Sequence, residues 1–539
     1  MLKHALAFLA AFALCGASGG TVVATIHGSG GSLAFTALHT YYMAPTSSPP
    51  SGWSVGNDSN NGTSKSTPWA TPNHSVVCGD VIIAASGNYG PMTNNFGSVS
   101  SCPSTSGGID GTGGVYFATM LCGGTYVGSC SIVGTQDKGT GAGVEVGANN
   151  WAVEGWAVSE GYNCSTSSGF GFMANTYSSA RKYVAFVNDI AYHNASGIGI
   201  SAHGPSGDGA DYLAFVGDIA QDSAGLCAGG ISTGAVVLIG LKDADAVAGT
   251  HILLAGNFSY NNQQTLGASD NSDGESYLFD TLDYPAPGYG QKIVFRDNIG
   301  AVSERFGFQL FYQNYNSTTP TIKIYNNTLV ASNQMNYSTV DPAQTGDINL
   351  QGTSGLFPWI VSISNNVVRE NKANPVGGVT IYTIMTQGTA SITIGGSGTQ
   401  NVLKGLASSC TGAGTCDSGF NAVTFGSAGT LGTNYYVDPT LNNLTDAVAN
   451  QIGTPNCTGF TNTAACEGVN LGSAATNPSL VYDLTPTVDA AGNGYQQPSS
   501  TCASSDTDYP TWLKGIVYLQ WNGTSLTENA GLVTKPCGL

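Results

Sequence analysis

A short pattern recurs eight times between about residue 150 and residue 400. Each copy has an apolar alternation, then a polar corner, then a second apolar alternation. Successive corners lie 29 to 41 residues apart. Self-similarity at such a period predicts a solenoid of stacked repeats. The corners are Val153-Glu154-Gly155, Val187-Asn188-Asp189, Val216-Gly217-Asp218, Ala255-Gly256-Asn257, Arg296-Asp297-Asn298, Tyr325-Asn326-Asn327, Ser364-Asn365-Asn366 and Ile394-Gly395-Gly396.

A second group of short apolar runs lies between the corners. One coil is therefore predicted to hold at least two short strands, a sharp corner and a loop of variable length, with alternate side chains filling the core. Asn and Gly suit the corners because they tolerate left-handed backbone, and stacked Asn side chains can hydrogen-bond along the stack. The runs are 169–172, 197–200, 230–232, 277–279, 306–308, 348–350 and 379–381.

Other repeat folds fit this spacing poorly. A doubly wound α/β fold needs amphipathic helices of about 10–15 residues between strands, and none is visible. The blades of a β-propeller repeat every 40–50 residues or so with four strands each, which the 29-residue spacings do not allow. The sequence predicts an all-β solenoid.

Charge is scarce and negative. Charged residues make up 9% of the 539, against about 25% in a typical soluble protein. The 41% apolar content argues against disorder. With 33 acidic and 15 basic residues the formal net charge is −18, and no basic patch occurs. We therefore expect no nucleic-acid partner and no membrane insertion, and a polyanionic substrate would need a mediating cation. We expect a monomer.

The start of the chain resembles an export signal. Lys3 and His4 precede an apolar run at 5–14 that is too short to span a bilayer, and small residues follow at 15–17. We predict a signal peptide at 1–17, a repeat domain with its N-terminal cap at 18–405 and a C-terminal cap region at 406–539. The predicted localisation is secreted, or extracellular.

Cysteines agree with export. One of the 13 lies in the signal, and the even 12 that remain suggest disulfides, whose connectivity the sequence leaves open. Short-range pairs that fit the spacing are Cys122/Cys130, Cys410/Cys416, Cys457/Cys466 and Cys502/Cys537.

The beginning of the repeat domain resembles a known family. The segments Gly56-Asn57-Asp58-Ser59-Asn60-Asn61-Gly62-Thr63, Thr67-Pro68-Trp69-Ala70-Thr71 and Cys78-Gly79-Asp80-Val81-Ile82 occur in this order. They resemble the opening coil of secreted right-handed parallel β-helix proteins of the pectate-lyase-like superfamily. The resemblance implies an all-β, right-handed parallel β-helix with an N-terminal cap and a disulfide-rich C-terminal cap.

One stretch concentrates acidic residues. Asp270, Asp273, Glu275, Asp280 and Asp283 fall within fourteen residues of a chain poor in charge. Aligning the repeats places Arg305 about one coil above positions 274 and 275. Asp273, Glu275 and Arg305 are then predicted to share one face, and Asp280 to point outward from the same strand. A register slip of one residue would reverse these directions.

The same region is loosely similar to family-nine polysaccharide lyases. In that family clustered carboxylates hold Ca²⁺, and a Lys or Arg on a nearby coil removes a proton from the uronate. The resemblance implies Ca²⁺ on Asp273, Glu275 and Asp280. The lyase lysine is not at its usual position here, so Arg305 is the candidate base, with Lys292 behind it. Phe311 and Tyr312 are candidates for stacking on sugar rings.

These observations predict a carbohydrate-active protein whose partner is a polysaccharide or a cell-surface glycan. The first hypothesis is Ca²⁺-assisted β-elimination of an acidic polysaccharide. The second is a non-enzymatic surface, adhesive or glycan-binding protein. The third is a glycoside hydrolase, which would use a carboxylate pair about 5–9.5 Å apart, such as Asp273 with Asp280 or Asp280 with Asp283. A purely structural interpretation also stays open, because Asp is an ordinary turn residue.

Overall fold

The structure is a computed structural model of the whole chain. It describes residues 32–34, 37–93, 95–103, 115–124, 128–133, 142–159, 161, 169–176, 179–192, 194–201, 209–221, 223, 234–260, 262, 274–280, 289–301, 303, 305–312, 320–330, 347–352, 360–369, 383–386, 391–396, 401–404, 416–417, 420–421, 423–424, 429–432, 434, 511–513, 519–521 and 526–529.

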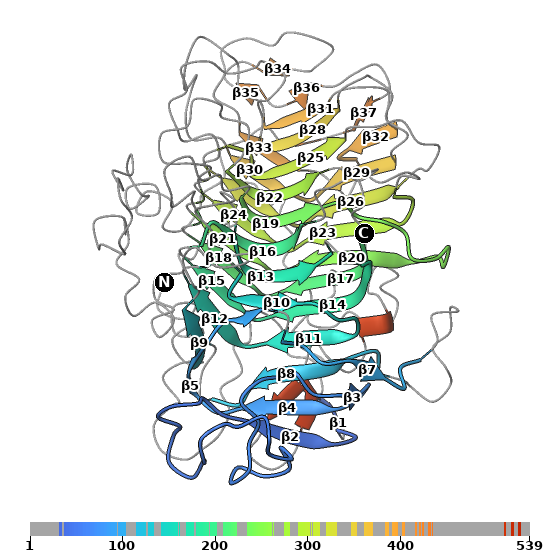
Figure 1. Cartoon of the computed structure of the whole chain (residues 1–539). Coiled ribbons are helices and arrows are strands. Elements are labelled where there is room, and N and C mark those ends of the chain that lie inside the picture. The colour runs from blue at the N-terminus through green and yellow to red at the C-terminus, as the bar shows by residue number, and fades with distance from the viewer. Residues whose placement is uncertain are drawn as a thin grey trace, which may run out of the picture.

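Three long sheets run side by side along the described part of the molecule (Figure 1). Sheet I has twelve strands, and sheets II and III have ten each. Sheet I consists of β2 (Thr40–Met43), β4 (Val81–Ala84), β8 (Ala118–Cys122), β11 (Trp151–Glu154), β14 (Arg181–Val187), β17 (Ala210–Val216), β20 (Thr250–Ala255), β23 (Lys292–Arg296), β26 (Thr321–Tyr325), β29 (Ile360–Ser364), β32 (Ser391–Ile394) and β37 (Gly429–Leu431).

Sheets II and III supply the other two sides of each coil. Sheet II consists of β5 (Gly87–Tyr89), β9 (Cys130–Val133), β12 (Trp156–Ser159), β15 (Ile190–Tyr192), β18 (Ile219–Gln221), β21 (Phe258–Tyr260), β24 (Ile299–Ala301), β27 (Thr328–Val330), β30 (Val367–Arg369) and β33 (Val402–Lys404). Sheet III consists of β6 (Met92–Thr93), β10 (Val144–Val146), β13 (Phe170–Asn175), β16 (Ser196–Ser201), β19 (Gly234–Ile239), β22 (Glu275–Asp280), β25 (Phe308–Tyr312), β28 (Ile348–Gly352), β31 (Ile384–Thr386) and β36 (Val423–Thr424).

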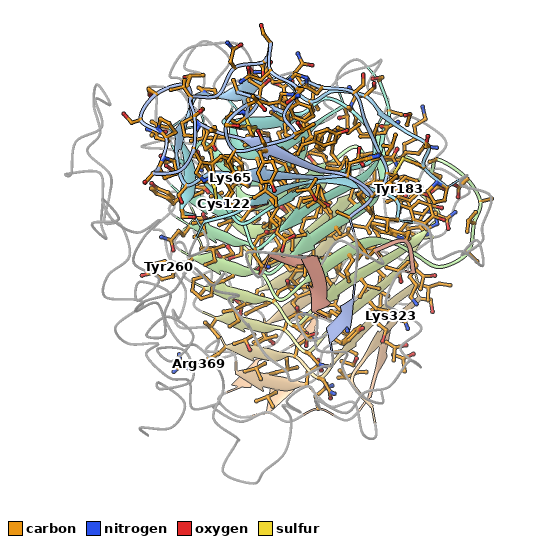
Figure 2. The ribbon with its side chains drawn as sticks, turned by 90° about the horizontal axis from the view of Figure 1, so that it is seen from below. Lys65, Cys122, Tyr183, Tyr260, Lys323 and Arg369 are labelled. Atoms are coloured by element: carbon orange, nitrogen blue, oxygen red, sulfur yellow. A yellow bond between two sulfur atoms is a disulfide. The ribbon has the colours of Figure 1, made fainter. Side chains whose placement is uncertain are left out.

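Each full coil passes through sheets I, II and III in that order, and neighbouring strands within a sheet are parallel. Val184 pairs with Leu213 in sheet I, for example, and Ile190 pairs with Ile219 in sheet II. The predicted fold class, a right-handed parallel β-helix, is confirmed. Figure 2 looks along the molecule from below and shows Tyr183 of sheet I and Tyr260 of sheet II on opposite sides.

Alternate side chains fill the interior of the coils, as the period-2 pattern predicts. In sheet I the inward row Phe186, Phe215, Leu254 and Phe295 stacks coil on coil in the main core. Short strands with small polar loops suffice, because each coil buries its apolar side chains against the next one.

The corners between sheets I and II use two residues with distinct roles. The first residue has left-handed backbone, with φ between 53° and 69° at Asn188, Gly217, Gly256 and Asp297. The second residue belongs to a side-chain ladder. Asn257 Oδ1 accepts a hydrogen bond from the backbone N–H of Asp218 at 3.0 Å, in the coil before it. The predicted stacking of corner side chains is therefore confirmed.

The ladder continues through eight rungs. At each Asn rung up to Asn401, the side-chain amide donates both to the Oδ1 of the next rung and to a backbone carbonyl. The rungs are Asp189, Asp218, Asn257, Asn298, Asn327, Asn366, Asn401 and Asn434.

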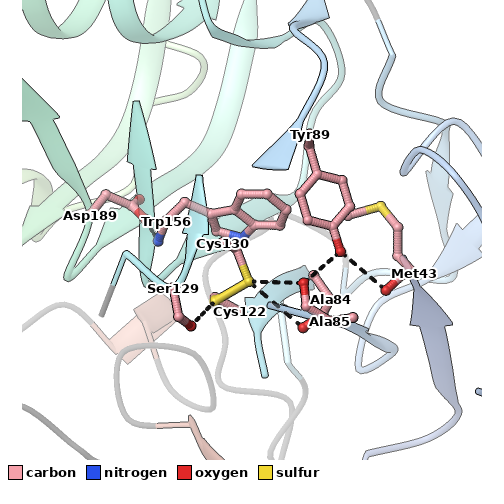
Figure 3. The surroundings of a disulfide bond; sticks show 9 residues. All are labelled: Met43, Ala84, Ala85, Tyr89, Cys122, Ser129, Cys130, Trp156 and Asp189. Atoms are coloured by element: carbon pink, nitrogen blue, oxygen red, sulfur yellow. Dashed lines mark hydrogen bonds between the residues drawn. A yellow bond between two sulfur atoms is a disulfide. The ribbon is translucent and has the colours of Figure 1, made fainter. Parts of the chain in front are cut away.

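A disulfide bond fastens the corresponding corner two coils below the lowest rung of the ladder. Cys122 at the end of β8 is bonded to Cys130 at the start of β9, beside Trp156 and Tyr89 (Figure 3). This pair was predicted from spacing. The bond between Cys78 and Cys102 was not. The other three predicted pairs lie wholly or partly outside the described residues.

The N-terminal segment 53–74 covers the free edge of β2. Backbone N–H groups of Tyr42 and Ala44 donate to the carbonyls of Gly62 and Trp69, so the edge strand is not left open. Asp58 accepts bonds from the backbone of residues 70 and 71, which holds this cap in shape.

The described parts of 406–539 lie in two places. Strands β34 (Cys416–Asp417), β35 (Phe420–Asn421), β36 and β37 belong to the last coils. The 3₁₀ helix η4 (Thr511–Leu513) packs instead on sheet I at the level of β8, β14 and β17. Strands β38 (Leu519–Trp521) and β39 (Leu526–Asn529) form a sheet with β1 (Ser32–Ala34), and β3 (Val76–Val77) pairs with β7 (Val99–Ser100).

The predicted domain boundaries stay predictions, and the predicted signal 1–17 lies outside the described residues. Within the described part of the chain, no helix has the length and hydrophobicity to cross a membrane.

Candidate functional site

The acidic stretch lies partly on β22 of sheet III. Tyr277 and Phe279 of this strand point into the core. Successive side chains of a strand point to opposite faces, so Leu278 and Asp280 lie on the outer face. Asp280 is half-buried, which agrees with the prediction that it points outward.

The outer face of sheet III changes character along the solenoid. On β19 and β22 it is largely apolar, where Val237, Ile239 and Leu278 pack together with Met173 of β13. On β10 and β13 the same face also holds a buried polar pair, because the Asn175 amide donates to the Glu145 carboxyl group. On the next two coils, at β25 and β28, the described side chains of this face are amides and an aromatic ring. By register Leu278 is followed by Gln309 and then Asn349, while Asp280 is followed by Phe311.

We call Asp280, Gln309, Phe311 and Asn349 the polar face. Gln309 and Asn349 are buried, whereas Asp280 and Phe311 are half-buried. Register partners on parallel strands lie about 4.8 Å apart, so a carboxylate and an aromatic ring meet directly at Asp280 and Phe311. The candidate stacking residue Phe311 therefore lies next to the acidic stretch. Tyr312 follows it on β25, but its side chain lies outside the described residues.

Glu275 occupies a different environment. It has the inward parity of Tyr277 and Phe279 and is fully buried. Five residues of strand separate it from Asp280, which corresponds to about 16 Å along β22. Calcium–oxygen bonds are about 2.3–2.6 Å long, so in this conformation Glu275 and Asp280 lie too far apart to share one ion. The predicted ligand roles of Asp273, Glu275 and Asp280 stay predictions.

Asp273 and Asp283 lie outside the described residues, so an ion site that pairs either of them with Glu275 or Asp280 stays a prediction. Among the residues that the structure describes, no group of three or more His, Cys, Asp or Glu side chains is arranged to hold a metal ion. The described residues do not fit the Ca²⁺ site that the resemblance implied.

Arg305 lies where the repeat alignment placed it. Its backbone N–H donates to the carbonyl oxygen of Gly274 at 3.4 Å, one coil away. Its guanidinium lies 5.3 Å from the centre of the Phe306 ring, and the side chain is buried. Arg305 therefore lies next to the acidic stretch, and its side chain is covered by the surrounding structure.

Lys292 lies on another side of the molecule. It begins β23 in sheet I, where it pairs with Thr250 and Thr321. Ile293 points into the core, so Lys292 points outward from sheet I. The structure does not bring Lys292 together with Asp280 and Phe311 on sheet III.

A second cluster of titratable side chains lies on the outer face of sheet I. The sequence patterns did not indicate it. His251 and Asp211 are both 1% exposed, and His251 Nδ1 lies 2.9 Å from Asp211 Oδ2. The Tyr289 hydroxyl donates to Asp211 at 2.8 Å. Burial lowers the pKa of His251, but the hydrogen bond and charge of Asp211 outweigh it and raise the pKa overall.

A stack of aromatic rings leads to this cluster. The rings of Tyr116, Tyr183, Tyr212 and His251 follow one another with centroid separations of 4.9, 4.5 and 4.0 Å. An alignment of the repeats places these rings in one column. Positions 183, 212 and 251 each come directly before one residue of the inward row Val184, Leu213 and Ile252.

Comparison with known proteins agrees with the fold. No protein-family model and no curated relative matches the chain. The chain is similar in structure to the pectate lyase Pel9A, at 13% identity and a TM-score of 0.35, over 75% of this chain and 80% of that one. It is also similar to a rhamnogalacturonan lyase, at 15% identity and a TM-score of 0.33, over 74% and 87%.

A third similar structure is the A-module of the Azotobacter vinelandii mannuronan C-5 epimerase AlgE4, at 10% identity and a TM-score of 0.25, over 74% of this chain and 89% of that one. At these identities and TM-scores the similarity carries no argument about this chain, and the parallel β-helix rests on the strand pairing described above.

Proposed function

We propose that this protein is a secreted, carbohydrate-active β-helix protein that binds a polysaccharide at the polar face of sheet III. One observation carries the proposal: Asp280 and Phe311 are register partners on an outer face whose side chains on the coil directly below, Val237 and Ile239, are apolar. A carboxylate accepts hydrogen bonds from sugar hydroxyls, and an aromatic ring packs against the C–H face of a sugar.

Buried amides lie beside these two side chains. Gln309 and Asn349 occupy the adjacent row and are buried, so Asp280 and Phe311 offer the exposed contacts of the polar face. Coils repeat about every 4.8 Å, so a polymer that lies along the solenoid meets Asp280 and Phe311 on successive coils. A surface with a net charge of −18 favours a neutral or weakly acidic glycan unless cations are present.

Binding to a panel of neutral and acidic polysaccharides, with and without Ca²⁺, tests the proposal. We expect Phe311→Ala and Asp280→Asn each to weaken binding about tenfold or more, since each removes a contact worth on the order of 1–2 kcal/mol. Matched controls are Ile360→Ala, an exposed apolar residue of sheet I, and Asp297→Asn at a left-handed corner. Equal binding by all four variants would contradict this site.

We propose β-elimination of an acidic polysaccharide as the reaction, with Arg305 as the base. Its backbone contact with Gly274 places Arg305 one coil from Glu275. A base must be neutral and must reach the substrate, so this role requires that the buried guanidinium becomes exposed and loses a proton when the polysaccharide binds. An elimination breaks a C–O bond as the base removes the proton from the neighbouring ring carbon, and it leaves an unsaturated uronate that absorbs in the ultraviolet. The described carboxylates do not fit a shared Ca²⁺ ion, so the cations that an acidic polysaccharide needs on this negatively charged surface would have to come from solution.

The assay follows ultraviolet absorbance during incubation with polyuronates. We expect product from the wild type and a loss of at least a hundredfold in rate for Arg305→Ala, the scale of a general base. Retained folding of the variant is checked by thermal denaturation. New reducing ends without ultraviolet product would point to hydrolysis, and binding without either product would point to the non-enzymatic alternative.

A further inference from the structure

The hydrogen bonds of His251 define its charge. Nδ1 lies 3.0 and 2.9 Å from the two carboxylate oxygens of Asp211, and Nε2 lies 2.8 Å from the carbonyl oxygen of Val247. A carboxylate and a carbonyl only accept hydrogen bonds, so both ring nitrogens must donate. The ring that fits this site is therefore the protonated, positively charged imidazolium.

Asp211 is its counter-ion. The carboxylate also accepts hydrogen bonds from the backbone N–H groups of Tyr212 and Ala244 and from the hydroxyl of Tyr289. With the ring N–H of His251, the buried carboxylate therefore accepts from four donor groups. The pair is thus a buried ion pair, and removal of its positive member leaves an uncompensated charge, which is the costly situation.

Further groups around the pair are mostly acidic. Asp243 and Asp245 lie in the segment 242–249 that leads into β20, and their charges act on the pair. The Tyr212 hydroxyl donates to Asp245 at 2.7 Å, and the Gly290 N–H donates to Asp243 at 2.9 Å. The titratable groups that face His251 or its partners are Asp211, Tyr183, Tyr212, Asp243, Asp245, Tyr289 and Lys292.

The C-terminal helix η4 is packed on the same place. The Trp512 indole N–H donates to the carbonyl of Thr250, the residue before His251, at 2.8 Å. The Trp512 ring also meets the Tyr212 ring edge-on, with centroids 5.6 Å apart, and Tyr212 stacks on His251. Figure 1 shows this helix as the red element beside β11 and β14. Residues 512 and 513 are buried by the contact.

We propose that the protonation state of His251 controls the docking of residues 511–513 on sheet I, so that loss of the ring proton releases this part of the C-terminal region. A neutral ring keeps one N–H, so it gives up its bond either to Asp211 or to Val247. In both cases the backbone and ring that carry Trp512 lose an anchor, and Asp211 is left negative beside Asp243 and Asp245.

The direction with pH follows from the ion pair. The pKa of His251 is raised in the folded protein. Its contribution to docking is therefore complete below the ordinary histidine pKa of about 6.5 and is lost as pH rises through the folded-state value. Docked protein is expected in acid solution and released protein in alkaline solution.

The test measures two quantities on the full chain between pH 5 and pH 10. Nuclear magnetic resonance of protein labelled at histidine follows the charge of His251. Hydrogen exchange, corrected for its intrinsic pH dependence, follows the amides of 511–513. We expect their protection to fall about tenfold or more, the equivalent of one lost hydrogen bond, with the midpoint of the His251 titration.

Two variants and one control make the result specific. His251→Gln should lack the protection at every pH. Asp211→Asn should move both midpoints to lower pH by about 1–3 units, because it removes the counter-charge. His39→Gln is the matched control: His39 also bonds an aspartate, Asp80, at 2.7 Å, but it lies in the N-terminal region, and its loss should leave 511–513 unchanged.

Three outcomes would overturn the proposal. Protection of 511–513 could stay constant while His251 titrates, His251 could keep its charge over the whole range, or His251→Gln could fold with wild-type protection. If His251→Gln does not fold, the midpoint shift in Asp211→Asn decides the question.

Discussion

Two rungs of the corner ladder are Asp where the other six are Asn, and Asp218 gives the sharper test. Its Oδ1 accepts the backbone N–H of Asp189 at 2.9 Å, as an Asn rung would. Its backbone N–H donates to Asn257 Oδ1 at 3.0 Å. Within the described residues, however, Asp218 Oδ2 lacks a well-formed hydrogen bond, and the Val216 N–H is the one further donor near this carboxyl group, although an Asn rung places its donating amide there. A neutral carboxyl O–H would complete the rung, whereas a carboxylate would not.

Burial raises the pKa of Asp218 well above its usual range, and burial and the charge of Asp218 do the same for Asp189. A group whose folded-state pKa is raised stabilises the fold fully below its unfolded pKa, here about 3.9, and this contribution is lost as pH rises through the folded value. Keeping the carboxyl neutral at pH 7 costs at most about 4 kcal/mol, from 1.36 kcal/mol per pH unit.

We therefore expect Asp218→Asn to stabilise the protein by about 1–4 kcal/mol at pH 7, and by less than about 1 kcal/mol near pH 3, where Asp is neutral anyway. Chemical denaturation at both pH values measures the difference. The reciprocal change Asn298→Asp should destabilise at pH 7 and recover in acid. A gain from Asp218→Asn that is equal at both pH values, or absent at pH 7, would refute the reasoning.

Two further predictions concern the corners. Asn327→Ala should lower the free energy of unfolding by about 2–4 kcal/mol at every pH. It removes two donated hydrogen bonds and leaves the Asn298 N–H buried without an acceptor. Chemical denaturation of Asn60→Ala, a matched variant in the cap, should show a smaller loss. Replacing Cys122 and Cys130 together by Ala should cost about 2.5 kcal/mol for so short a loop, and a reductant should then have less additional effect on the variant than on the wild type.

The β-helix architecture could be predicted from the sequence because the same pattern of strands and corner residues recurs in each coil. Corner residues such as Asn326 and Asn327 predict both the left-handed backbone at the first position and the side-chain ladder at the second. The apolar residues after each corner predict the register between coils. That register placed Arg305 beside Gly274 correctly, and it placed Asp280 on an outer face.

The site was harder to predict because it depends on distance and direction within one strand. Glu275 and Asp280 are close in the sequence, yet their side chains point to opposite faces of the sheet. Their backbones are also about 16 Å apart along β22. The cluster at His251 was missed for another reason. Trp512 reaches Thr250 across 262 residues, and no local pattern encodes such a contact.

The ladder has a direction, and this bears on how such a molecule changes its length. Each rung from Asp189 to Asn401 accepts from the coil before it, and its backbone N–H donates to the rung of the coil after it, so each of these coils offers the next one the same connection that it received. Removal or duplication of a segment from one rung to the next, such as 299–327, joins two compatible ends. A whole coil is therefore the unit in which this fold can lengthen or shorten, and the loops that differ between coils can be exchanged without altering the scaffold that carries them.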